Sequence, residues 1–320
     1  MDYRRLGDAG IKVSAVALGG WINYGEGKVP QESAREVVEA AHDAGINYFD
    51  LADVYGNGNA EEQMGALLSR YPRHTLVMAT KVYFPMSDDP NDQGLSRKHI
   101  MESIDKSLRH LGTDYVDLYF CHRPDPETPI LETARAMNDL IRQGKVLYWG
   151  TSLWSEEQLR TAYDLCKEND LTPPQVEQPR FSMLYREPVE STILPLARGR
   201  GMGVVVFSPL AQGMLTGKYD QGVPEGTRFQ QEGWAREQNM TSANVTKVKR
   251  LKPIADELGI TRGQLALAWI LAHDGVSCAI TGATRPEQVR DNARAAEVTL
   301  SADVMQRIEQ ALAASAPPAS

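Results

Sequence analysis

The chain has 320 residues, of which 42% are hydrophobic and 24% are charged. This composition is typical of a folded globular protein and argues against a disordered chain. Its 34 basic and 42 acidic residues give a formal net charge of −8 without any block of five like charges. A nucleic-acid partner is therefore not expected. The cysteines, Cys121, Cys166 and Cys278, are odd in number and form no CxxC pair, which excludes a disulfide framework and favours a reducing compartment.

The amino terminus, residues 1–10, is charged and lacks the apolar core of a signal peptide,. No later run of roughly 18 apolar residues occurs that would cross a membrane. These features predict a cytoplasmic protein without membrane insertion.

The first predicted element is a hairpin over residues 3–14, with a turn from Gly7 to Gly10,. We expect it to plug the amino-terminal end of the domain that follows. Short β-branched or apolar runs then alternate with segments of helical periodicity. The predicted strands are 13–18, 46–50, 75–80, 115–120, 146–150, 174–178, 203–207 and 277–281.

Two of the intervening segments show clear helical patterns. Residues 33–45 carry an apolar stripe and end at Gly45, and residues 97–112 end at Gly112,. Strict alternation of strand and helix predicts a parallel sheet, and eight strands favour a closed (β/α)8 barrel over an open doubly wound sheet. The open sheet would require a GxGxxG turn after an early strand, and the first strand continues instead into ALGGWINYG,.

The glycines at 199, 201 and 203 precede a strand and are read as a helix-to-strand turn,. No linker interrupts the alternation, so residues 1–320 are predicted to form one domain. Two long connections, 82–95 and 208–243, follow the carboxyl ends of strands, which form the catalytic face of a barrel. Together with residues 22–30, they are expected to determine substrate selectivity.

Polar residues of four kinds follow the ends of three neighbouring predicted strands. Asp50 ends the second strand, Tyr55 lies in the loop after it, Lys81 closes the third and His122 follows the fourth. Residues at neighbouring strand ends of a barrel converge on one mouth. These side chains are therefore expected to lie together.

Such a set can transfer a proton. A phenol is a poor acid at neutral pH unless a cation favours its phenolate, and Lys81 can supply that cation while Asp50 holds the ammonium. His122 can donate a hydrogen bond to an oxygen that becomes negative. Taken singly, each residue has an ordinary structural explanation. A tyrosine in a loop can cover apolar surface, an aspartate at a strand end can cap a helix, and a lysine at a strand end can be solvated. Cys121 and His122 could be half of a metal site, but no further ligand motif lies nearby, so no metal is predicted.

Several ordered stretches resemble the aldo-keto reductases, specifically the branch that contains the potassium-channel β subunits and their bacterial relatives. They are FDLADVYGNGNAEEQMG, MATK, YVDLYFCHRPDPETPILETARAMNDLIRQGKVLYWGTS, FSPLAQGMLTGKY and GATRPEQVRDN. The resemblance covers nearly the whole chain. It implies a catalytic tetrad of Asp50, Tyr55, Lys81 and His122, with Tyr55 as the general acid.

The resemblance also implies a nicotinamide cofactor across the barrel mouth. The nicotinamide would lie among Gly20, Trp21, Asp50, Ser152, Gln178, Phe207, Ser208, Pro209, Leu210, Ala211 and Gln212. Lys218 and Arg228 would hold the pyrophosphate. The adenosine end would contact Gly282, Thr284, Gln288, Asp291 and Asn292.

NADPH is predicted to be preferred over NADH. Thr284 and Gln288 can donate hydrogen bonds to a 2′-phosphate and Arg285 can add a charge-assisted contact. A helix that begins near Pro286 would also direct its backbone N–H groups at that phosphate.

Two departures from the channel β subunits bear on function. Those subunits carry Asn where this chain has His122, and many carry Arg where this chain has Leu153. The first departure favours a reductase that converts a small carbonyl substrate. The alternative is a cofactor-sensing regulatory subunit with a membrane partner and little turnover. The branch is often tetrameric, which makes a homo-oligomer plausible.

Overall fold

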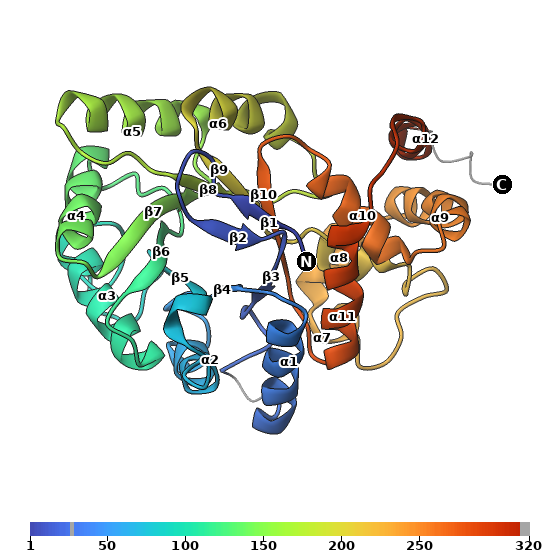
Figure 1. Cartoon of the computed structure of the whole chain (residues 1–320), viewed down its shortest axis with the longest axis horizontal. Helices are drawn as coiled ribbons and strands as arrows, with labels where there is room; N and C mark the ends of the chain where they lie inside the picture. The colour runs from blue at the N-terminus through green and yellow to red at the C-terminus, as the bar shows by residue number, and fades with distance from the viewer. Residues whose placement is uncertain (26–28, 314–320) are drawn as a thin grey trace.

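The computed structural model describes residues 1–25 and 29–313. A closed barrel of eight parallel strands, in the order β10-β3-β4-β5-β6-β7-β8-β9, follows an antiparallel hairpin of β1 and β2 (Figure 1). The predicted (β/α)8 barrel and hairpin are confirmed. The strands are β1 Tyr3–Arg5, β2 Lys12–Ser14, β3 Val16–Gly19, β4 Tyr48–Asp50, β5 Val77–Val82, β6 Val116–Cys121, β7 Val146–Ser152, β8 Val176–Gln178, β9 Gly203–Val206 and β10 Val276–Thr281.

Helices surround the barrel, and α9 and α12 lie together outside the ring (Figure 1). The α-helices are α1 Gln31–Asp43, α2 Asn59–Leu68, α3 Arg97–Leu111, α4 Ile130–Arg142, α5 Glu156–Glu168, α6 Leu194–Arg200, α7 Arg228–Gln231, α8 Gly233–Asn239, α9 Ser242–Glu257, α10 Arg262–Leu271, α11 Pro286–Arg294 and α12 Ala302–Ala313. Shorter helical turns are η1 Arg73–Thr75, η2 Val189–Ile193, η3 Ala211–Thr216 and η4 Ala295–Glu297. Within the described residues, no helix combines the length and apolar character needed to cross a membrane.

The glycine stops predicted from the sequence occur where expected. Gly112 caps α3 in the left-handed conformation, and Gly201 caps α6 in the same way before β9. Gly45 follows α1 with a φ of 79°. These positions favour glycine because a side chain is strained there.

The predicted strand 13–18 is wrong in extent, because this segment contributes to two sheets. Residues up to Ser14 belong to the hairpin, whereas β3 of the barrel begins at Val16. Ala15 joins the two sheets: its N–H donates to Asp2, and its carbonyl accepts from Ala279. A largely apolar run that passes from one sheet into another cannot be distinguished from a single strand by its sequence pattern.

The hairpin closes the amino-terminal end of the barrel. Leu6 is fully buried in the cluster that fills the barrel interior, beside Val13 and the inward residues of the strands. Gly203 permits this approach, since a Cβ there would come within 2.8 Å of the Leu6 side chain. Arg4 fastens the hairpin by donating from Nη1 to the carbonyl of Leu271 at 2.7 Å.

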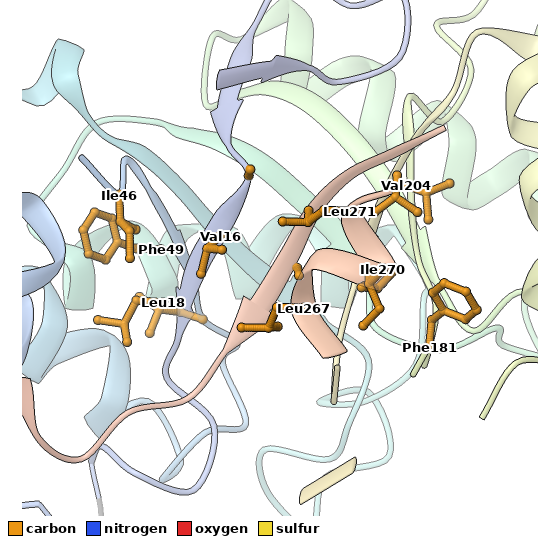
Figure 2. Packing of buried hydrophobic residues seen from close by; sticks show 14 of the residues in the cluster. Val16, Leu18, Ile46, Phe49, Phe181, Val204, Leu267, Ile270 and Leu271 are labelled. Carbon is orange, nitrogen blue, oxygen red and sulfur yellow. The ribbon is translucent and has the colours of Figure 1, made fainter. Parts of the chain in front are cut away.

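A second and larger apolar cluster lies between the strands and the helices. Val16 and Leu18 face outward from β3, and Leu267 and Ile270 of α10 lie in the same layer (Figure 2). Because side chains alternate along a strand, residues of one parity meet the helices and those of the other parity meet inside the barrel. This alternation determines which polar residues reach the barrel mouth.

The two long connections differ in structure. Residues 83–96 contain no helix or strand. The segment 208–243, the longer of the two predicted connections, contains η3, α7, α8 and the start of α9. Its apolar residues, including Phe229 and Ala235, are buried and account for this order. Of the third predicted loop, 22–30, residues 26–28 lie outside the described residues.

Candidate active site

Three candidate catalytic residues and the cofactor-binding candidate Gln178 share the inward parity of the barrel interior. Each lies two residues beyond an interior apolar residue of its own strand: Asp50 beyond Tyr48, Lys81 beyond Ala79, His122 beyond Phe120 and Gln178 beyond Val176. The strand register therefore carries all four to the carboxyl end of the barrel. The interior changes from apolar to polar within one step of the pleat.

Lys81 is the centre of a compact hydrogen-bonded group. Its Nζ donates to Asp50 Oδ2 at 2.7 Å, to the carbonyl of Leu51 at 2.6 Å and to the Tyr55 hydroxyl at 3.1 Å. The lysine is completely buried, and the side chain of Asp50 is 5% exposed. A buried ammonium requires such satisfied contacts, since an unpaired charge would be costly.

The protonation of this group follows from its surroundings. Burial opposes a charged lysine, but attraction by Asp50 and Tyr55 outweighs it and raises the pKa of Lys81. Burial also raises the pKa of the Tyr55 phenol above its ordinary value, although Lys81 acts to lower it. Lys81 thus acts in the direction expected from the sequence, but desolvation dominates the net result. Tyr55 is protonated at neutral pH.

His122 lies beside Tyr55 and stays neutral. The two ring centroids are 5.8 Å apart in an edge-to-face arrangement, and the centroid of the Phe84 ring lies 4.9 Å from that of the imidazole, also edge to face. Burial, then Lys81 and Arg123, lower the pKa of His122 well below its usual range. Nδ1 is buried without a hydrogen-bond partner in the described part of the chain. An N–H at the buried Nδ1 would have no acceptor there, so we place the ring proton on Nε2,.

Ser152 and Gln178 extend the same network toward the expected nicotinamide position. Gln178 Nε2 donates to Asp50 Oδ1 at 2.9 Å, and Ser152 Oγ donates to the carbonyl of Gln178 at 2.9 Å. The N–H of Gly20 donates to the carbonyl of Asp50 at 2.9 Å. Trp21 is 40% exposed at the rim.

The segment after β9 turns sharply. Ser208, Ala211 and Gln212 have φ values of 54°, 48° and 58°, a conformation that is uncommon for residues other than glycine. Phe207 forms a bridge with Arg180, and Pro209 and Leu210 lead into η3. Strained backbone of this kind often marks a binding site.

Three cations gather beyond this turn. Arg228 donates from Nη1 to Gln212 Oε1 at 2.8 Å and from Nη2 to Asn23 Oδ1 at 3.0 Å. Reduced solvation, then the nearby Arg228 and Arg285, lower the pKa of Lys218. Within residues 1–25 and 29–313, neither Lys218 nor Arg285 forms an ion pair.

The expected adenosine residues surround the start of α11, which begins at Pro286 as predicted. Gln288 Oε1 accepts from the N–H and the hydroxyl of Thr284 at 2.8 and 3.3 Å. Gly282 follows β10, and Asn292 is buried. Asp291 is engaged internally, because its carboxylate accepts from Gln264 Nε2 at 2.8 Å and from Thr261 Oγ1 at 3.2 Å.

Several further residues at the mouth escaped sequence reasoning. Asn23 orients Arg228, and Trp234 of α8 contacts Trp21 with ring centroids 5.6 Å apart. Asp53 accepts from Ser103 Oγ at 2.8 Å, and burial raises its pKa to about 7. Only Asp53 offered a sequence signal, since it lies in the loop of Tyr55.

Comparison with known proteins agrees with this geometry. The family model described as "Aldo/keto reductase family" matches residues 15–313. A protein of Arabidopsis thaliana named "Probable voltage-gated potassium channel subunit beta" is 44% identical over 319 residues, covering 98% of this chain and 97% of the relative. A protein of the same name from Oryza sativa subsp. japonica is 43% identical over 316 residues, with coverages of 97% and 96%. The chain therefore belongs to the aldo/keto reductase family and is an NAD(P)H-dependent oxidoreductase that acts on carbonyl groups.

Proposed function

We propose that this protein reduces aldehydes or ketones to alcohols with NADPH, and that Tyr55 is the general acid. The observation that carries the proposal is the contact of 3.1 Å between the Tyr55 hydroxyl and Lys81 Nζ, with Asp50 on the other side of the ammonium. A phenol in this position is protonated before the reaction and has a cation beside it afterwards.

The side chains divide the work in a simple way. When bound, the reduced nicotinamide supplies a hydride to the carbonyl carbon. Tyr55 gives its proton to the carbonyl oxygen as the negative charge develops there, and Lys81 stabilises the phenolate that remains. The neutral His122 donates from Nε2 to the same oxygen and orients the carbonyl. Asp50 keeps Lys81 charged, and solvent returns the proton to Tyr55.

The residues present fit a nicotinamide dinucleotide. Ser152 offers a hydroxyl group and Gln178 an amide group beside the tetrad, as recognition of a carboxamide requires. Lys218, Arg228 and Arg285 form a cluster of cations at the far side of the mouth, where Lys218 and Arg285 have no ion pair in the described structure. Phosphate groups are the natural counter-charge for such a cluster.

Arg285 supports the preference for NADPH. It precedes Pro286 and is exposed beside the first backbone N–H groups of α11. A 2′-phosphate near this terminus would gain both the guanidinium and the helix dipole.

Steady-state reduction of 4-nitrobenzaldehyde tests the proposal. We expect turnover with NADPH that depends on Tyr55. A protein that binds NADPH tightly but does not reduce this reactive aldehyde would contradict it.

A second candidate is a cofactor-sensing regulatory subunit, which the names of the two relatives favour. The complete acid-base set, with His122 where the channel β subunits carry Asn, argues for the enzyme. Cofactor binding does not separate the two, whereas the rate of aldehyde reduction does.

A further inference from the structure

Arg123 lies beside the proposed acid and is not neutralised by the protein. It follows His122, and its Nη1 donates to the carbonyl oxygen of His122. Its guanidinium carbon lies 5.3 Å from the centroid of the Phe84 ring. Within the described part of the chain, no carboxylate forms an ion pair with Arg123. The guanidinium therefore places a positive charge at the mouth and has further N–H groups that can donate to a ligand.

The guanidinium is within electrostatic reach of both groups that face the substrate carbonyl. Arg123 acts to lower the pKa of Tyr55 and of His122. Conversely, Tyr55 is the first of the groups that act to raise the pKa of Arg123. A ligand atom near the tetrad would thus also be near Arg123.

Among residues 1–25 and 29–313, Glu177 is the carboxyl group that acts on Arg123, and it is poorly suited to neutralise the guanidinium. Glu177 is the outward-facing residue of β8, where Thr151 Oγ1 donates to its carboxyl group. Burial raises the pKa of Glu177 to about 8, so its carboxyl group is mostly protonated at neutral pH. In the described part of the chain, the charge of Arg123 therefore has no ionised carboxylate to compensate it.

Phe84 gives the same region an apolar face. The centroid of its ring lies 4.9 Å from that of His122 and 5.3 Å from that of Tyr83, both in edge-to-face arrangements. A partly buried cation beside aromatic rings loses hydration, and an anionic ligand would restore that lost interaction. A ring that carries an anion would satisfy both Phe84 and Arg123.

We propose that Arg123 binds an anionic group of the substrate, so that the protein prefers carbonyl compounds that carry a carboxylate. This inference rests on the proposed reductase function and specifies its substrate class. The carbonyl oxygen faces Tyr55 and His122, while the carboxylate accepts hydrogen bonds from the guanidinium. The reaction itself is unchanged: hydride adds to the carbonyl carbon and Tyr55 provides the proton.

Pairs of substituted benzaldehydes test this assignment. A nitro group and a carboxylate have nearly the same shape but differ in charge. We would measure kcat/KM for the 2-, 3- and 4-carboxybenzaldehydes and for the matching nitrobenzaldehydes. The ratio of carboxylate to nitro substrate is then compared between the parent and its variants, so that the different reactivity of the two aldehydes cancels.

Arg123→Gln should lower this ratio by about tenfold or more for at least one ring position, since a charge-assisted hydrogen bond is lost. Arg123→Lys should retain part of the preference. Arg142→Gln removes the same charge from the exposed carboxyl end of α4 and should leave the ratio unchanged.

Other results would overturn the inference. If Arg123→Gln reduces activity on both members of each pair equally, Arg123 serves the tetrad and not a substrate anion. If the parent reduces nitrobenzaldehydes but the ratio of carboxylate to nitro substrate is the same in Arg123→Gln, the reductase function is supported and the anion site is contradicted.

If the parent reduces neither aldehyde, the proposed function fails. The affinity of the NADP⁺-loaded protein for 4-carboxybenzaldehyde, measured by calorimetry, then tests the anion site independently of turnover. Binding that weakens about tenfold in Arg123→Gln supports it, and equal binding contradicts it.

Discussion

The two ends of the barrel are built from the same eight strands but have opposite character. At the amino-terminal end, the interior is apolar and is closed by Leu6 of the hairpin. At the carboxyl end, the next inward positions carry Asp50, Lys81 and His122. Asp50 and Lys81 form a buried, hydrogen-bonded ion pair, and the buried His122 lies beside Tyr55. The comparison teaches that strand register provides positions, whereas the identity of the last inward residue decides whether a position stabilises the fold or performs chemistry.

The largest expected effect is at the polar end. Tyr55→Phe removes the proposed acid and should lower kcat for aldehyde reduction by about 10² to 10⁴-fold. NADPH affinity, measured by fluorescence titration, should persist because the ring is retained. Activity within a few-fold of the parent would show that another group supplies the proton.

Lys81→Met should also reduce turnover strongly. It removes the cation that opposes the rise in the pKa of Tyr55, so the pH profile of residual activity should move upward. Asp50→Asn should act in the same direction but more weakly. The measurement is kcat against pH, and an unshifted profile in an active Lys81→Met protein would leave the lysine without its proposed role.

The apolar end should respond in stability and not in chemistry. Leu6 is fully buried, and Leu6→Ala should lower the free energy of unfolding by about 2 to 5 kcal/mol. The turnover of the remaining folded protein should be near that of the parent. Leu258→Ala, at a position 36% exposed, is the control. A large loss of kcat in folded Leu6→Ala would mean that the two ends are not independent.

Glu177 sharpens the comparison, because it is a buried carboxyl group on the outward face near the mouth. Its pKa is raised from 4.5 to about 8 by burial. The folded state therefore holds a proton that the unfolded state releases, and stability falls as pH rises from about 4.5 to about 8. Glu177→Gln does not titrate, so its stability relative to the parent should be higher at pH 9 than at pH 5, by on the order of a few kcal/mol. Chemical denaturation at the two pH values measures this, and an equal difference at both would refute it.

The smallest effect concerns the cofactor. Arg285→Ala should lower the ratio of kcat/KM for NADPH to that for NADH by about tenfold, the value of one charge-assisted contact. A parent ratio near or below one would refute the preference. An unchanged ratio in the variant would exclude Arg285 as its source.

The sequence allowed the catalytic positions to be predicted because polar residues end apolar runs at Asp50, Lys81 and His122. A strand of period two followed by a charge is a local pattern, and barrel topology then brings distant strand ends together. The boundary at Ala15 could not be predicted in this way, since the run 13–18, which is apolar apart from Ser14, reads as one strand although it changes sheets.

Contacts between the loop after β3 and the long connection 208–243 were beyond sequence reasoning. Asn23 meets Arg228 and Trp21 meets Trp234 across long separations, and no period relates them. Lys218 and Arg228 were reached only through the family resemblance. The net rise in the pKa of Tyr55 also required the structure, because burial and the attraction of Lys81 oppose each other and the sequence does not show which is larger.

The seating of the hairpin has a consequence for the order of folding. Arg4 and Leu6 are synthesised before the residues on which they rest. These are Gly203, the first residue of β9, Leu271, the last residue of α10, and Val276, the first residue of β10. The hairpin therefore cannot be covered until these last strands of the barrel have been synthesised. Contacts across such separations form slowly, so the Leu6 side chain stays exposed until β9 and β10 have followed, and a chaperone or a neighbouring nascent chain can reach it in that interval.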